Sequence, residues 1–155
     1  MAKRTPHSIG GVAMIVLSSD RKYVLIAKRI KQPGAGYQIP GGCVEEGETL
    51  KEAAIRETRE ETGIVLNPAK TFFSCAIQSG YYGSGNLHLI FYSIVNTDEI
   101  PPNPEPHKCE DWQWYTKDTI PDGVWYRMSR MAVDNFFSKE PQNYIEDQTE
   151  IGKIK

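Results

Sequence analysis

Short runs of apolar and β-branched residues, separated by polar turns, are the main pattern of this chain and predict strands. The first run, Ile9 to Leu17, leads into the polar turn Ser18 to Lys22. The segment Gln32 to Gly36 carries glycine and proline and is predicted to be a loop. Further extended segments are predicted at Tyr23 to Ala27, Tyr37 to Ile39, Thr71 to Gln78, Leu87 to Val95 and Trp112 to Tyr115.

Two segments have the pattern of helices instead. Thr49 to Thr62 contains no proline or glycine, is rich in Glu, Ala and Arg, and is followed by Gly63 at the place of a C-cap. A second helix is predicted at Val124 to Phe137. Because strands and helices do not alternate regularly, the pattern predicts an α/β fold with a mixed sheet and helices packed on it.

The length of the chain predicts a single domain. The 155 residues have a mass of 17.5 kDa, and a chain of this size buries roughly 70% of its unfolded surface, which is enough for one core. We expect one domain over residues 1–155 with its core at about 9–137. Residues 138–155 are mostly polar and are predicted to be a loosely held tail.

The overall charge is close to neutral and argues against long nucleic acids as partners. Twenty acidic residues face 18 basic ones, which gives a net charge of -2 and an isoelectric point near 5.9. Proteins that bind nucleic-acid backbones usually carry a basic excess. The longest apolar run near the N-terminus, Val12 to Leu17, is too short to span a bilayer, so no membrane association is expected.

Cysteine and histidine positions give no sign of a disulfide framework or a zinc site. Cys43, Cys75 and Cys109 are odd in number and form no CxxC pair, which favours a cytoplasmic location. The three histidines are far apart in the sequence and lack the spacing of zinc ligands. We expect them to be polar side chains with satisfied hydrogen bonds: His7, His88 and His107.

The acidic residues are concentrated in one place, since seven glutamates lie between Gly42 and Ile64. On a helical wheel of about 100° per residue, Glu57 and Glu61 fall about 20° to either side of Leu50, in the middle of the face expected to be buried. Burial, mutual repulsion and the negative end of the helix dipole all disfavour charge there. A hard cation such as Mg²⁺ would relieve all three effects.

A solvated acidic stripe, offset by Arg56 and Arg59, is the alternative interpretation of these glutamates. The spacing around them favours the cation site. Gly42 to Ile64 resembles the Nudix box, GX5EX7REUXEEXGU, in which U is aliphatic. One position departs from this pattern, Thr58 in place of an aliphatic residue; the matching positions are Gly42, Glu48, Arg56, Glu57, Glu60, Glu61, Gly63 and Ile64.

Residues outside the box are similar to the MutT-like diphosphatases of the Nudix family. The similarity rests on Lys28-Arg29, Gly34-Ala35-Gly36, Gln38 to Gly42 and Glu110 to Trp114. It implies a Nudix α/β/α sandwich around a mixed central sheet. It also implies hydrolysis, dependent on Mg²⁺ or Mn²⁺, of a nucleoside diphosphate linked to another group.

The resemblance also implies roles for individual residues. Glu57 and Glu61 are the leading metal ligands, Glu60 joins them or handles the attacking water, and the backbone carbonyl of Gly41 is a further candidate. Glu48 either reaches the metal or caps the helix, and Arg56 orients carboxylates through ion pairs. Two glutamates are candidates for the catalytic base, Glu60 and Glu110. The parts of the motif with a structural role are Gly42, Glu48, Arg56 and Gly63.

Substrate contacts are expected from the loops. Arg29 follows a strand and is either a phosphate-binding cation or an ordinary solvated arginine. Tyr81 and Tyr82 lie in a hairpin loop, where they either stack on a base or pack against the protein. The expected partner is a small nucleotide, and a homodimer is the family's default assembly.

The first functional hypothesis is cleavage of a nucleoside triphosphate, with an ordinary, oxidised or otherwise modified base, to the monophosphate and pyrophosphate. Such an enzyme would remove damaged nucleotides from the pool. A dinucleoside polyphosphate is the second substrate hypothesis, because that branch of the family carries a tyrosine at the offset at which Tyr81 follows Ile64. Other nucleoside-diphosphate compounds, and a Nudix-fold binding module without turnover, are the remaining alternatives.

Overall fold

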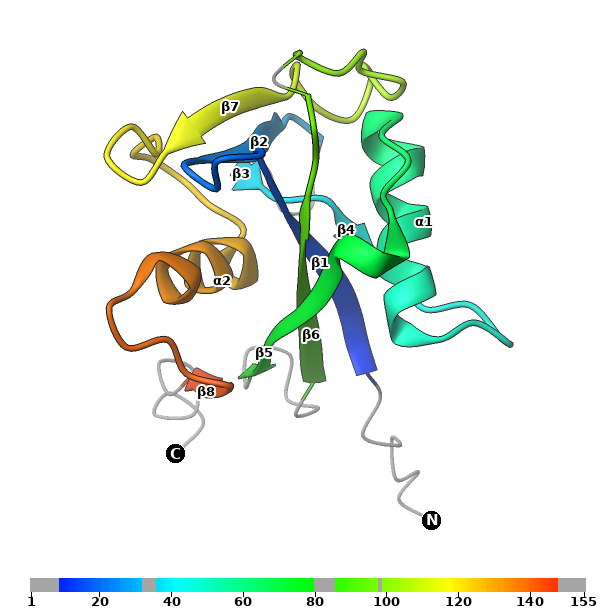
Figure 1. The fold of residues 1–155 in the computed structure, drawn as a ribbon, viewed down its shortest axis with the longest axis vertical. Coiled ribbons are helices and arrows are strands. Elements are labelled where there is room, and N and C mark those ends of the chain that lie inside the picture. Colours follow the sequence, from blue (N-terminus) through cyan, green and yellow to red (C-terminus); the bar gives the residue numbers. More distant parts are fainter. Residues whose placement is uncertain (1–8, 32–35, 80–85, 98, 148–155) are drawn as a thin grey trace.

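A mixed sheet of eight strands forms the centre of the protein (Figure 1). The computed structural model describes residues 9–31, 36–79, 86–97 and 99–147. The helices are α1 (Leu50–Thr62), the short 3-10 helix η1 (Pro68–Lys70) and α2 (Arg127–Phe137). The strands are β1 (Ile9–Leu17), β2 (Tyr23–Arg29), β3 (Gly36–Gln38), β4 (Gly41–Gly42), β5 (Thr71–Ser79), β6 (Asn86–Ile94), β7 (Gln113–Thr116) and β8 (Tyr144–Asp147).

Parallel and antiparallel pairings both occur in this sheet, whose strand order is β3-β2-β1-β6-β5-β8. The pairs β1–β6 and β5–β8 are parallel, and the other pairs are antiparallel. Two short strands branch from the main path, since β4 pairs with β1 and β7 pairs with β2. The predicted mixed α/β architecture is therefore confirmed.

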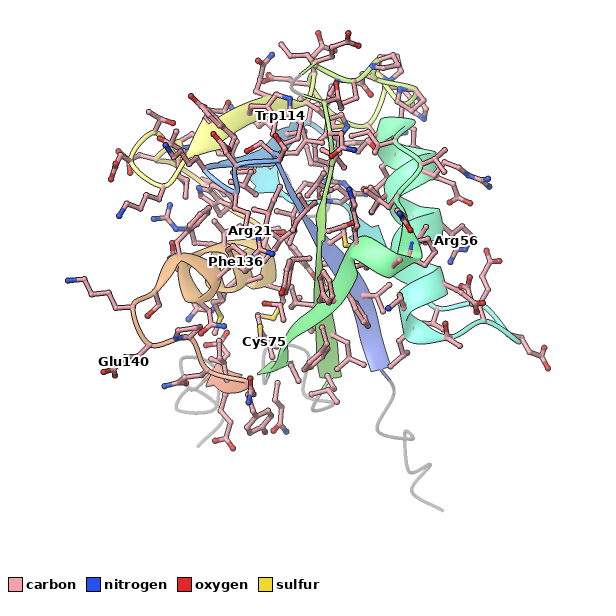
Figure 2. The ribbon with its side chains drawn as sticks, viewed as in Figure 1. Arg21, Arg56, Cys75, Trp114, Phe136 and Glu140 are labelled. Atoms are coloured by element: carbon pink, nitrogen blue, oxygen red, sulfur yellow. The ribbon has the colours of Figure 1, made fainter. Side chains whose placement is uncertain are left out.

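The two helices cover opposite faces of the sheet and create two hydrophobic layers. Side chains of β1 alternate between the layers: Met14 and Val16 pack with α1, whereas Ile15 and Leu17 pack with α2. Figure 2 shows Arg56 on α1 and Phe136 on α2, on the two sides of the sheet. This layering places the acidic helix α1 against β1 and β4.

Helix α1 begins and ends with the signals that its sequence predicts. The hydroxyl of Thr49 accepts a hydrogen bond from the Glu52 amide, and the Glu52 carboxylate accepts one from the Thr49 amide, forming a capping box. Gly63 ends the helix with a φ of 80°, a conformation that favours glycine. Both ends of α1 are thus fixed, which sets the rotation of the helix and the direction of its glutamates.

Three segments differ from the sequence-based expectations, each because of tertiary pairing. Helix α2 begins at Arg127 rather than Val124, since residues 124–126 exchange backbone hydrogen bonds with Tyr37. Strand β4 consists of two glycines and has no side-chain pattern to predict it. The expected tail contains strand β8, whose Asp147 is 2% exposed and accepts hydrogen bonds from Arg127 of α2.

Neither helix in the described ranges has the length and apolar character needed to cross a lipid bilayer. The three cysteines are free thiols, of which only Cys43 is exposed.

The departure from the Nudix pattern at Thr58 is explained by its own helix. Thr58 is fully buried, and its hydroxyl donates a hydrogen bond of 2.7 Å to the carbonyl oxygen of Ala54. A threonine whose hydroxyl donates a hydrogen bond within its own helix can occupy a buried position where the Nudix pattern has an aliphatic side chain.

We predict that Thr58→Val changes the free energy of unfolding by no more than about 1 kcal/mol, because the local hydrogen bond and the added apolar burial offset each other. Urea unfolding of the two proteins measures this difference. Thr58→Ala, which also leaves a void, is the control and is expected to destabilise more. A loss of more than about 2 kcal/mol in the valine variant would show that the hydroxyl has a further role.

Candidate functional site

Two carboxylates of α1 face the interior, as the helical wheel predicts. The Glu57 side chain is only 16% exposed, and Glu61 is mostly buried, whereas the Glu60 side chain is 50% exposed. Thr58 and Thr62 on the same helix are fully buried. The solvated-stripe interpretation therefore does not hold for Glu57 and Glu61.

Arg56 connects the acidic groups around the start of this site. Its guanidinium holds Glu48 through two hydrogen bonds, from Nη2 at 2.7 Å and from Nε at 3.0 Å. Its Nη1 lies 3.0 Å from Glu57 Oε1 and 3.3 Å from Glu60 Oε2. A further hydrogen bond to the carbonyl oxygen of Cys43 ties α1 to the segment after β4. The Arg56 guanidinium thus fixes the segment after β4 to α1 and holds two candidate metal ligands, Glu57 and Glu60.

Glu48 belongs to this ion-pair network and not to the helix cap. Thr49 and Glu52 cap α1, while the Glu48 carboxylate accepts hydrogen bonds from Arg56 and from the Glu45 amide. These hydrogen bonds, that of Arg56 first, lower the pKa of Glu48 below its ordinary value.

Strand β4 lies directly against the inward carboxylates, and it can do so because it is made of glycine. A Cβ on Gly42 would lie 2.3 Å from Cδ of Glu57. A Cβ on Gly41 would lie 2.4 Å from the carbonyl oxygen of Val12 on β1. The two glycines therefore leave the space that the Glu57 carboxylate and the neighbouring strand fill.

Glu61 is the most strongly perturbed acid of the site. Burial, with smaller contributions from the charges of Glu57 and Glu105, raises its pKa to about 8. The Gly41 amide, which donates a hydrogen bond of 3.2 Å to Oε2, and the charge of Arg29 act in the opposite direction. The indole of Trp112 donates to the main-chain carbonyl of Glu61 and fixes the last turn of the helix. In the part of the chain that the structure describes, Glu61 forms no ion pair.

The donor set fits a hard divalent cation. Glu57 and Glu61 offer only oxygen atoms, both have a pKa raised by burial, and the charge of Glu57 contributes to the raised pKa of Glu61. Among the described residues, no three acidic, histidine or cysteine side chains gather closely enough to hold a metal by themselves. The reason is visible in the contacts, because Arg56 draws Glu57 and Glu60 toward itself while Glu61 turns to Gly41.

The loop that precedes β7 contributes an acid that was not expected. Glu105, whose carboxylate pairs with Lys108 at 2.6 Å, is the loop residue whose charge raises the pKa of Glu61. Glu110 is exposed and its charge instead contributes to the raised pKa of Tyr115. Tyr81 and Tyr82 lie outside the described residues.

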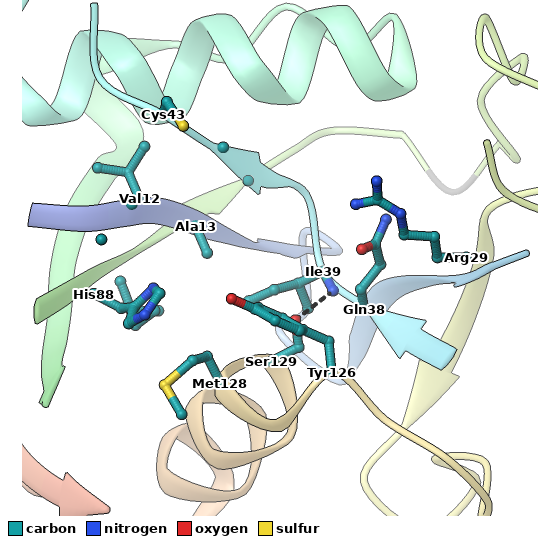
Figure 3. A pocket seen from close by; sticks show the side chains of 15 residues that line it. Val12, Ala13, Arg29, Gln38, Ile39, Cys43, His88, Tyr126, Met128 and Ser129 are labelled. Atoms are coloured by element: carbon teal, nitrogen blue, oxygen red, sulfur yellow. Dashed lines mark hydrogen bonds between the residues drawn. The ribbon is translucent and has the colours of Figure 1, made fainter. Parts of the chain in front are cut away.

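A pocket of about 250 Å³ is lined by both glycines of β4 (Figure 3). Arg29, Gln38 and His88 are among its polar lining residues, and Tyr126 and Met128 come from α2 and the residue before it. Gly41, Gly42 and Cys43 also line it, so the pocket and the carboxylates share the same short segment as a wall. The pocket therefore opens beside the candidate cation site.

His88 was expected to be a satisfied polar side chain, and this prediction is wrong. Its Nε2 is buried without a hydrogen-bond partner among the described residues, and burial lowers the pKa of the ring. The sequence carries a signal of its position, since His88, Ile90, Tyr92 and Ile94 alternate along β6 and share one face. An inward histidine in such a series indicates a polar group placed inside the apolar layer.

Comparisons with known proteins agree with this geometry. The NUDIX domain model matches residues 8–133. The chain is 31% identical over 109 residues to "NAD-capped RNA hydrolase NudC" of Stutzerimonas stutzeri, a match that covers 70% of this chain and 37% of that protein, so the chain spans little more than a third of that relative's length. It is 28% identical over 127 residues to "RNA pyrophosphohydrolase" of Pelagibacter ubique, covering 74% of this chain and 80% of that protein.

Among solved structures, the MutT NUDIX hydrolase from Burkholderia pseudomallei superimposes with a TM-score of 0.63 at 25% identity. The superposition covers 80% of this chain and 95% of that structure.

We predict that Gly42→Ala lowers the hydrolytic activity at least tenfold while the fold persists. The added methyl group would occupy the place of the Glu57 carboxylate, and the backbone at Gly42 has no positive φ that alanine would strain. Mn²⁺ binding by calorimetry and the thermal midpoint separate the two effects. Val65→Ile, which adds a methyl group at an exposed position, is the control. Full Mn²⁺ affinity in the alanine variant would contradict the prediction.

The raised pKa of Glu61 predicts a pH dependence of stability in metal-free buffer. Its pKa rises from an ordinary value of 4.5 to about 8 in the folded protein. The folded state therefore binds the proton more tightly, and the resulting stabilisation is full below pH 4.5 and is lost as the pH rises to about 8. Glu61→Gln, which stays neutral, is expected to gain stability relative to the wild type over this range.

Thermal unfolding of both proteins in EDTA from pH 5 to pH 9 measures this difference. Glu52→Gln on the same helix is the control and should follow the wild-type curve, since Gln also completes a capping box. Parallel curves for the wild type and Glu61→Gln would remove the assignment of this titration to Glu61.

Proposed function

Because the chain belongs to the NUDIX family, we propose that it is a divalent-metal-dependent hydrolase that cleaves a phosphoric anhydride bond of a nucleotide. The observation that carries this proposal is the pair of inward carboxylates, Glu57 and Glu61. Among the described residues Glu61 forms no ion pair, and the charge of Arg29 only partly offsets the effect of burial on its pKa. A pair of acids that stayed neutral would give no reason for the space that Gly42 leaves beside Glu57. The arrangement is explained by a ligand that brings positive charge.

Mg²⁺ or Mn²⁺ would be held by Glu57 and Glu61, with Glu60 and the carbonyl of Gly41 as further donors. When bound, such an ion supplies charge neutralisation for phosphate oxygens and lowers the pKa of water. Arg56 keeps Glu57 and Glu60 in place and acts as a positioning residue. Arg29 lines the adjacent pocket and would bind phosphate oxygens, because its Nε has no partner among the described residues.

The hydrolytic step requires a water molecule that attacks one phosphorus of the chain. The bond from that phosphorus to the bridging oxygen breaks, and the leaving phosphate or pyrophosphate takes the electron pair. The proton of the water goes to a carboxylate base. We assign this role to Glu60, which is half exposed and beside Glu57, over Glu110, whose charge acts on Tyr115 instead.

The proposed substrate is a nucleoside triphosphate, with an ordinary or modified base, that yields a monophosphate and pyrophosphate. The volume of about 250 Å³ supports one nucleoside, since it is just below the roughly 300–1,000 Å³ that is usual for small-molecule pockets. This size weakens the case for a dinucleoside polyphosphate held by both of its bases. Three free thiols fit the cytoplasm as the proposed location, and a homodimer is proposed only as the family's default.

The 5′ end of an RNA is a second candidate substrate. The relative from Pelagibacter ubique is named an RNA pyrophosphohydrolase, and the relative from Stutzerimonas stutzeri is named an NAD-capped RNA hydrolase. The chemistry is the same, because both substrates carry a nucleoside linked through phosphoric anhydride bonds. A net charge of -2 favours the free nucleotide, since it offers little attraction for the RNA backbone.

We predict that Glu57→Gln and Glu61→Gln each reduce Mg²⁺-dependent turnover by at least a hundredfold, because each removes a charged ligand. The assay measures pyrophosphate and nucleotide products separately. The substrates are the ordinary nucleoside triphosphates, their oxidised and methylated forms, a dinucleoside polyphosphate and a short 5′-triphosphorylated RNA.

Glu52→Gln is the matched control on the same helix and should keep full activity. Undiminished turnover in both test variants would overturn the metal assignment. A wild-type protein that binds nucleotides but hydrolyses none of this panel would favour a binding module without turnover.

A further inference from the structure

Two unsatisfied polar atoms mark one pocket of the protein. Within the described residues, the buried side-chain nitrogen and oxygen atoms without a hydrogen-bond partner are Arg29 Nε and His88 Nε2. Both residues line the pocket of about 250 Å³, and Figure 3 shows them at opposite ends of it. Folded proteins leave few buried polar atoms unpaired, so two in one cavity require an explanation.

We propose that His88 is the specificity-determining residue of this pocket, and that its imidazole forms a hydrogen bond with the polar edge of a nucleobase. The inference rests on the proposed function, in which Arg29 binds phosphate oxygens at the other end of the pocket. It adds that the base occupies the end of the pocket near His88 and that the His88 side chain distinguishes one base from another.

The surroundings of His88 favour an uncharged ligand group. His88 is 8% exposed, and burial lowers the pKa of its ring, so the imidazole is neutral at pH 7 with one donor and one acceptor nitrogen. The walls near it include the apolar side chains of Ile90 and Met128. A phosphate would require a cation there, whereas a base offers flat apolar faces and a polar edge.

A glycine of the neighbouring strand lies beside the ring, so no side chain covers it from that position. His88 on β6 pairs with Gly11 on β1, and a Cβ on Gly11 would lie 3.8 Å from Nδ1 of His88. The hydroxyl of Tyr126 also points into the pocket (Figure 3). A ligand edge that enters between β1 and α2 therefore meets polar groups and not only an apolar wall.

Other roles for His88 agree less well with these contacts. A zinc ligand needs further histidine, cysteine or acidic partners, and the described residues hold no such group. A packing role is costly, because a buried polar atom without a partner destabilises the fold. Selection of a ligand explains why such a residue is present in an otherwise apolar layer.

The test compares the wild type with His88→Leu and His88→Gln. The probes are the four ribonucleoside triphosphates in α,β-methylene form, which resist cleavage, and inorganic tripolyphosphate, which lacks a base. Calorimetry with Mg²⁺ present measures binding of the analogues without turnover. The wild type should bind one base more tightly than the others. In His88→Leu the ratio of dissociation constants between the other bases and this base should fall about tenfold, while the affinity for tripolyphosphate stays unchanged. His88→Gln should keep part of the preference.

Stability supplies the second readout. Leucine removes an unpaired polar atom, so the thermal midpoint of His88→Leu should rise by about 2–4 °C as its base preference falls. A packing role predicts the opposite, a lower midpoint with unchanged preference. Ile94→Ala, on the same face of β6 but outside the pocket, is the control and should lower the midpoint without changing base preference.

The inference and the proposed function can fail separately. If the wild type binds the four analogues equally, or if His88→Leu keeps the wild-type preference, the inference is overturned even when the enzyme hydrolyses nucleotides. If base preference depends on His88 but no nucleotide is hydrolysed, the proposed reaction is wrong and the role of His88 stands.

Discussion

The structure of this site depends on the burial of two carboxylates on the inward face of one helix. Glu57 and Glu61 occupy positions where helix α1 would otherwise present apolar side chains to the sheet. An ionised carboxylate is unfavourable at such positions, and the protein stabilises the two carboxylates to different extents. Arg56 compensates Glu57 with an ion pair of 3.0 Å, whereas Glu61 receives one backbone hydrogen bond from Gly41. The remaining imbalance at Glu61 is what makes a cation the best-fitting ligand.

Strand β4 is short because it serves two neighbours at once. Gly42 lies against Glu57, Gly41 lies against β1, and both glycines line the pocket. Any side chain at Gly42 would displace the carboxylate, and any side chain at Gly41 would collide with β1. Strand β4 therefore separates helix α1 from the pocket that Arg29 lines. The absence of two Cβ atoms, at Gly41 and Gly42, lets the pocket lie close to the carboxylates of α1.

Much of this arrangement could be predicted because it is local in sequence. The direction of Glu57 and Glu61 follows from helical periodicity, and the ends of α1 follow from Thr49, Glu52 and Gly63. Even the departure at Thr58 is resolved within four residues, by the carbonyl of Ala54. Helical contacts of this range depend on spacing alone, so they can be read from the chain.

Features that depend on distant pairing could not be predicted in the same way. Strand β8 joins the sheet by pairing with β5, and Arg127 of α2 binds its buried Asp147 while Ile145 packs in the layer of α2. The proximity of Glu105 to Glu61 depends on how the loop before β7 folds back on α1, which neither segment encodes by itself. Periodicity places His88 on a face of β6 but cannot show that its Nε2 lacks a hydrogen-bond partner among the described residues.

Hydrogen-bond satisfaction divides the polar residues of the site into two kinds. Arg56 and Glu48 have partners within the protein, so their removal would disturb the fold and the function together. Arg29 and His88 each keep a buried nitrogen without a partner in the described chain, and both face one cavity. Such groups cost stability in the free protein and recover it only when a ligand supplies the missing atoms. Stability and ligand affinity should therefore change in the same direction at Arg56 and in opposite directions at His88.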